Sequence, residues 1–294
     1  MPRTLCLIVF SVLQSIACRS APPKLDTVEA ASPRVIAESQ KPARSPEPAK
    51  PTVSCGDSLI DLDRWMSDGL LVIGEQHGTQ EIPRIVAQTV CAVSASGKTT
   101  WLTLEIPRDE QPRLDAFLTT GDEAALLEGP FWRRDYQDGR SSEGMLGLLR
   151  EARRLRTAGR DIRLLTMDVP STGDPAGQDR DSHMAAIVAQ KRAEAPEEPM
   201  VLLVGNIHAS RKVKIPRPLV WRLAKQGVAL KTLLVETSGG TAWMCGSSCG
   251  PVPVSGKDFG PESRVIETPE AVTWGYDALL YLGALSPASP AWRK

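Results

Sequence analysis

The chain has 294 residues and a formal net charge of +0 at pH 7, because 35 Lys and Arg residues balance 35 Asp and Glu residues. Balanced charge gives no reason to expect a nucleic-acid partner, since binding to phosphates needs a basic surface. The hydrophobic content of 41% is enough for the core of one or two globular domains. No apolar run is long enough to predict a membrane-spanning helix in the mature protein.

The first 17 residues have the pattern of a signal peptide. Arg3 supplies a positive charge, Leu5 to Leu13 form an apolar core, and small residues precede Cys18. The pattern also resembles a bacterial lipobox, although Ser15 stands where a lipobox has Leu. We therefore expect a signal peptide over residues 1–17 and a lipid on Cys18 that attaches the mature protein to a membrane. An ordinary signal peptide cut nearby is the alternative.

Residues 18–52 are rich in Pro, Ala, Ser and Lys and show neither helical nor strand periodicity. Such a segment buries too little apolar surface to offset the entropy of ordering it. We expect it to be a flexible tether between the lipid and a folded domain over residues 53–294. The predicted location is the bacterial cell envelope, facing the periplasm or the cell surface.

The remaining cysteines favour disulfide bonds. Export places Cys55, Cys91, Cys245 and Cys249 in an oxidising compartment. Cys245 and Cys249 are flanked by glycines and predict a small closed loop, and Cys55 with Cys91 could tie the start of the domain to its first helix. Four cysteines allow three connectivities, and a zinc site is the alternative use of the same residues.

The folded domain is expected to be α/β, with a mostly parallel sheet between helices. Short Val/Leu-rich runs alternate with amphipathic stretches, as in parallel sheets that are covered on both faces. The predicted strands are residues 70–73, 101–104, 162–165, 201–204, 230–235 and 278–282. The predicted helices are residues 81–93, 144–157, 181–194 and 218–226. Residues 135–142 interrupt this alternation and predict a loop excursion, with short helices over 114–127 as a small cap.

Acidic and histidine side chains follow the predicted strands. Their positions are Glu75 and His77, Glu105, Asp168, His208, and Glu236. The carboxyl ends of parallel strands meet at one edge of a sheet, where α/β proteins bind ligands. Carboxyl and imidazole groups that converge change each other's proton affinity, as catalytic sites require. The sequence therefore predicts a Glu/His site at this edge, and the alternative is a set of polar groups that only satisfy strand ends.

Four short motifs resemble the superfamily of erythromycin esterases, ChaN-like proteins and TIKI-type proteases. They are Gly-Glu75-x-His77-Gly, the strand that ends in Glu105, the helix Arg180-Asp181-x-x-Met184-Ala185, and Gly205-Asn206-Ile207-His208. The resemblance covers about residues 59–282. It implies a site of Glu75, His77, Glu105, Arg180 and His208, with a function that differs among the relatives.

Hydrolysis of an ester or amide bond is the leading hypothesis, with a small molecule or a peptide as substrate. His77 is the candidate base, since Glu75 or Glu105 could orient its other ring nitrogen. His208 or Arg180 could stabilise the negative charge that develops. Arg180 also suits a carboxylate partner or an anionic group of a substrate.

Two further hypotheses use a cofactor. TIKI-type relatives imply a divalent metal, which His77, Glu105 and His208 could bind, with Glu75 as a further ligand. ChaN-like relatives imply haem binding without catalysis, for which Tyr136 and Tyr281 are the available axial tyrosines.

Overall fold

A parallel sheet with helices on both faces makes up the described part of the chain. The computed structural model describes residues 53–56, 58–171, 179–212 and 217–293. The chain divides into the units Met1–Pro48 and Ala49–Lys294, and all described residues belong to the second. The expected signal peptide over residues 1–17, the lipidation site Cys18 and the tether over residues 18–52 lie outside the described residues. Within the described ranges, no helix combines the length and hydropathy needed to span a membrane.

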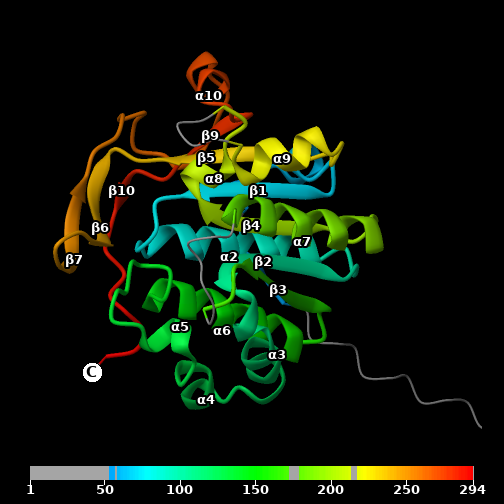
Figure 1. Cartoon of the computed structure of the whole chain (residues 1–294). Coiled ribbons are helices and arrows are strands. Elements are labelled where there is room, and N and C mark those ends of the chain that lie inside the picture. Colours follow the sequence, from blue (N-terminus) through cyan, green and yellow to red (C-terminus); the bar gives the residue numbers. More distant parts are fainter. Residues whose placement is uncertain (1–52, 57, 172–178, 213–216, 294) are drawn as a thin grey trace, which may run out of the picture. The chain divides into compact units, whose positions relative to one another are not determined.

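The main sheet has seven strands in the order β3-β2-β4-β1-β5-β9-β8. Figure 1 shows the strands from β3 to β9 following one another in this order. Every neighbouring pair is parallel except β8 with β9. The strands are β1 (Leu70–Glu75), β2 (Thr100–Pro107), β3 (Ile162–Asp168), β4 (Met200–Gly205), β5 (Lys231–Glu236), β8 (Arg264–Ile266) and β9 (Ala278–Tyr281). The expected α/β class and the mostly parallel sheet are confirmed.

Alternate residues of each central strand face different helices. In β1, Leu71 and Ile73 belong to the core under α2 (Glu81–Ser94) and α6 (Glu143–Thr157). Leu70 and Val72 belong to the core under α7 (Arg180–Glu194) and α9 (Leu219–Lys225). All four side chains are fully buried, which explains why the strand is apolar at every position rather than at every second one.

The remaining helices are α1 (Leu62–Trp65), η1 (Arg108–Glu110), α3 (Gln111–Thr120), α4 (Glu123–Leu127), α5 (Pro130–Arg133), α8 (Asn206–Ala209) and α10 (Pro269–Thr273). The helices expected over residues 114–127 are present as α3 and α4. Of these two, α3 packs against β3 and α6.

A second, three-stranded sheet was not expected from the sequence. It consists of β10 (Ala284–Leu285), β6 (Gly239–Cys245) and β7 (Cys249–Val254). A disulfide between Cys245 and Cys249 closes the β6–β7 turn, and a second disulfide joins Cys55 to Cys91 of α2. Disulfides are typical of proteins outside the cytoplasm, so both bonds indicate an exported protein.

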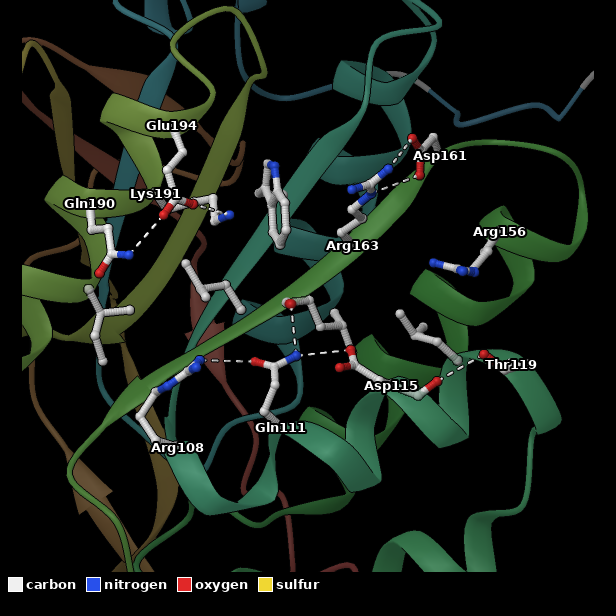
Figure 2. A pocket seen from close by; sticks show the side chains of 15 residues that line it. Arg108, Gln111, Asp115, Thr119, Arg156, Asp161, Arg163, Gln190, Lys191 and Glu194 are labelled. Carbon is white, nitrogen blue, oxygen red and sulfur yellow. Dashed lines mark hydrogen bonds and ion pairs between the residues drawn. The ribbon is translucent and has the colours of Figure 1, made fainter.

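Side chains cover the outer backbone groups of the edge strand β3. The Gln111 side chain accepts a hydrogen bond from the Thr166 N–H (2.8 Å) and donates one to the Leu164 carbonyl (3.0 Å). Arg108 donates to the Thr166 carbonyl (2.8 Å). Figure 2 shows these side chains on one side of β3 in a cavity of about 590 Å³, with α7 on the other side. None of the described residues that line this cavity belongs to the predicted Glu/His site.

Candidate active site

Four adjacent strands deliver the predicted site residues to one edge of the sheet. In spatial order, β3 ends at Asp168, β2 carries Glu105, β4 ends at Gly205 and β1 ends at Glu75. Glu75 and Gly205 are register partners in the pair of β1 and β4. The carboxyl groups therefore lie close together because the strands are parallel and their carboxyl ends coincide.

His77 lies between two buried carboxylates. Its Nδ1 is 2.9 Å from Glu75 Oε1, and its Nε2 is 3.5 Å from Glu105 Oε2. Burial alone would lower the pKa of His77, but Glu105 and Glu75 outweigh it and raise this pKa to about 10. At neutral pH the His77 ring is therefore an imidazolium.

Gly205 leaves the space that His77 occupies. A Cβ atom on Gly205 would lie 2.8 Å from His77 Nε2 and 3.4 Å from Glu105 Oε2. The Gly205 N–H donates to Glu105 Oε2 at 2.7 Å and so fixes that carboxylate. The glycine is needed for close approach, and its backbone φ of −54° is ordinary.

Arg180 connects the carboxylates to the second histidine. Its Nε lies 2.6 Å from Asp168 Oδ1, and its Nη2 lies 2.6 Å from Asp168 Oδ2 and 2.5 Å from Glu105 Oε1. Its Nη1 lies 3.2 Å from His208 Nε2. Burial would raise the pKa of the Glu105 carboxyl, but His77, Arg180 and Arg140 hold it well below its usual range. These cations therefore favour the ionised form of Glu105.

His208 is held by a carboxylate on the other side of its ring. His208 Nδ1 is 2.8 Å from Asp181 Oδ1, and the Leu219 N–H donates to the same oxygen at 2.6 Å. A guanidinium can only donate, so His208 Nε2 accepts from Arg180 and the proton of the ring is on Nδ1. The arrangement gives His208 a lone pair on Nε2 that faces the cluster.

The structure brings all five predicted site residues into one connected cluster and adds three that the sequence did not indicate. Arg140 contacts Asp168 (2.9 Å) and Glu105 (3.3 Å), and Asp138 binds the guanidinium of Arg140 at 2.8 Å. Asp181 is the third. Asp181 follows Arg180 directly in the helix motif, and this position could have identified it as a site residue. Arg140 and Asp138 lie in a loop whose sequence has no strand or helix pattern, so the sequence could not place them.

Glu236 and His183, two other polar residues near the motifs, are not part of the cluster. Glu236 Oε1 accepts hydrogen bonds from the Thr237 and Lys257 N–H groups, and it contacts no member of the cluster among the described residues. His183 lies on α7, and its buried Nε2 has no hydrogen-bond partner within the described ranges.

The donor set does not fit a divalent metal. His208 Nε2 and Glu105 Oε1, which a metal would need, both accept N–H groups of Arg180. A cation at that point would meet the guanidinium charge. No group of three or more His, Cys, Asp or Glu side chains in the described part has the arrangement of a metal site.

The two tyrosines are already paired and do not fit an axial haem ligand. The Tyr136 hydroxyl donates to the Cys245 carbonyl (2.8 Å), and the Tyr281 hydroxyl donates to Asp258 (2.8 Å). Tyr281 is buried in β9 as a core residue.

Solved structures with the same fold exist at low sequence identity. A Bacillus cereus protein has a TM-score of 0.58 at 13% identity, over 83% of this chain and 96% of that one. A succinoglycan biosynthesis protein has a TM-score of 0.56 at 10% identity, over 82% and 95%. An erythromycin esterase mutant in its open conformation has a TM-score of 0.53 at 14% identity, over 75% and 91%. These similarities show the fold.

No protein-family model matches the chain, and no curated protein matches its sequence.

Proposed function

We propose that this protein is a hydrolase of ester or amide bonds whose Glu/His site activates water. The proposal rests on the cluster around the Glu105–Arg180 ion pair. In it, His77 lies beside Glu105 and His208 beside Arg180, and each histidine is also held by a second carboxylate, Glu75 or Asp181. The fold shared with an erythromycin esterase is consistent with such a site. Function on this fold depends on the site and not on the fold alone.

In this proposal His208 is the base. Asp181 fixes the Nδ1–H tautomer, so the Nε2 lone pair can take a proton once Arg180 no longer donates to it. A water that replaces the 3.2 Å contact between Arg180 Nη1 and His208 Nε2 would be oriented by both groups. Loss of its proton to Nε2 gives the nucleophile that attacks the carbonyl carbon.

His77 then acts as the acid. Its raised pKa, about 10, keeps the ring protonated at neutral pH, so the ring can donate a proton to the developing oxyanion or to the leaving group. This reverses the role of base that the sequence suggested for His77. Glu75 and Glu105 keep the charge on the ring, and Glu105 also positions Arg180.

The pH dependence of kcat/KM distinguishes the two roles of His77. If His77 donates a proton, kcat/KM falls as the pH rises through about 10, because the imidazolium is lost. If His77 is the base, kcat/KM rises over the same range. The measurement uses the best substrate from a panel of esters and amides, with the wild-type protein and its His77→Gln variant.

The matched variants His77→Gln and His208→Gln should each lower kcat by roughly 100-fold or more, as for loss of a general acid or base. His183→Gln on α7 is the control and should keep its activity, since His183 lies outside the cluster. Full turnover by His208→Gln with intact circular dichroism would refute the proposed base.

A further inference from the structure

The charges of the proposed site are arranged in two layers. Three of its carboxylates are almost fully buried, because the side chains of Glu75 and Glu105 are each 4% exposed and that of Asp168 is 5% exposed. Asp138, which binds Arg140, is 24% exposed. The cations of the site face solvent. Arg180 is 31% exposed and Arg140 is 17% exposed. A molecule that approaches Arg180 therefore meets its guanidinium before the buried oxygens of Glu105 and Asp168.

The two guanidinium groups lie next to each other. Arg140 and Arg180 share two acceptor atoms, Glu105 Oε1 and Asp168 Oδ2. The Arg180 Nη1 group has two hydrogens and uses one of them on His208 Nε2. The Arg140 Nη2 group uses one of its two hydrogens on Asp138. Each arginine thus keeps one N–H that has no acceptor among the described residues.

Two acids near these arginines, Asp138 and Asp179, are each paired with a further arginine. Asp138 is shared between Arg140 and Arg134. Asp179, which caps α7 beside Arg180, is paired with Arg222. His77 adds a third cation that is 21% exposed. The partly exposed cations Arg140, Arg180 and His77 therefore outnumber the partly exposed carboxylate of Asp138.

We infer that the substrate carries an oxyanion group, such as a phosphate, sulfate or carboxylate, close to the bond that is hydrolysed. Arg140 and Arg180 bind this group through the two remaining N–H donors, each of which supplies one charge-assisted hydrogen bond. This inference rests on the proposed function for its substrate, but the binding of an oxyanion does not require turnover.

Inorganic phosphate is the probe for binding, measured by isothermal titration calorimetry with the full chain at constant ionic strength. We expect saturable binding that weakens as sodium chloride is raised. Arg140→Gln should weaken it about tenfold, the loss of one charge-assisted hydrogen bond. Arg140→Lys, which keeps the charge, should retain part of the affinity. Arg150→Gln, on an exposed ion pair of α6, is the control and should bind like the wild type.

Equal phosphate affinity in Arg140→Gln and Arg150→Gln, or no saturable binding by the wild type, would overturn the inference. If Arg140→Gln does not fold, wild-type binding of phosphate against chloride decides the matter alone.

Paired substrates separate this inference from the proposed function. Esters that differ only in a neutral or anionic substituent should differ in kcat/KM at least tenfold in favour of the anionic one, with competitive inhibition by phosphate. Hydrolysis of both esters at equal rates would support the hydrolase and contradict the oxyanion site. Phosphate binding without hydrolysis of any ester or amide would support the oxyanion site and contradict the hydrolase.

Discussion

At the scale of single residues, the site depends on the absence of a side chain at Gly205 as well as on its charged groups. His77 Nε2 occupies the place where a side chain at position 205 would begin. The chain at this position has an ordinary backbone conformation, so alanine could adopt it without backbone strain. Any effect of a substitution would therefore come from contact with His77 and Glu105.

Gly205→Ala should lower kcat at least tenfold, because the added methyl group displaces His77 from between its carboxylates. The cost to the free energy of unfolding should be about 1–3 kcal/mol, the usual range for an overpacked site. Turnover and urea unfolding measure the two effects.

Gly147→Ala is the control, because no atom lies within 4 Å of its added methyl group. It should leave kcat unchanged and stabilise α6 by about 0.5–1 kcal/mol. Wild-type turnover by Gly205→Ala would show that His77 does not need its present position.

At the scale of elements, the edge strand β3 illustrates how a parallel sheet ends without exposing its backbone. If another parallel strand lay beside β3, one of its residues would form hydrogen bonds with both the Leu164 carbonyl and the Thr166 N–H. The amide of Gln111 makes both of these bonds from α3. An uncovered edge is a template for pairing with another chain, and Gln111 removes that template.

Gln111→Ala should expose the edge and promote association between copies of the chain. Sedimentation velocity should show a mean mass that rises with protein concentration. Gln190→Ala is matched to it, since the Gln190 side chain lines the same cavity but donates to Glu194 and not to β3 among the described residues. Concentration dependence in both variants, or in neither, would contradict the role of Gln111.

The β6–β7 hairpin connects elements that carry the site. Trp243 donates its backbone N–H to the Gly78 carbonyl (2.8 Å) and its indole N–H to the Gln137 carbonyl (3.0 Å). It thereby joins the loop that follows His77 to the loop that carries Arg140. The position of the two loops thus depends on a strand more than 100 residues further along the chain.

At the scale of the whole molecule, the two disulfides close loops of very different length. Cys55–Cys91 spans 36 residues, whereas Cys245–Cys249 spans 4. A longer closed loop removes more conformational entropy from the unfolded chain. The Cys55–Cys91 disulfide should therefore contribute more to the free energy of unfolding than the Cys245–Cys249 disulfide.

Replacing both Cys55 and Cys91 by Ser should lower the free energy of unfolding by about 4 kcal/mol, and replacing Cys245 and Cys249 by Ser should lower it by about 2 kcal/mol. Chemical unfolding without reductant measures both. A larger loss from the short loop would mean that the hairpin contacts, and not loop closure, set its contribution.

Much of the fold and most of the site could be predicted from the sequence, because both depend on local sequence patterns. Apolar runs of strand length identify β1 to β5, and the acids and histidines directly after them must lie at one edge once the strands are parallel. The periodic helices α2, α6 and α7 follow from the same kind of local pattern.

The tertiary structure decided the features that depend on residues far apart in the chain. Arg140 lies in a loop without periodicity, so only folding places it on Glu105 and Asp168. The charge of His77 depends on Glu105 as well as on its neighbour Glu75, and a sequence does not contain that distance. The sequence did not predict β6 and β7, because these strands are rich in glycine and proline and have no strand-like alternation of apolar residues. Contacts with distant loops stabilise them.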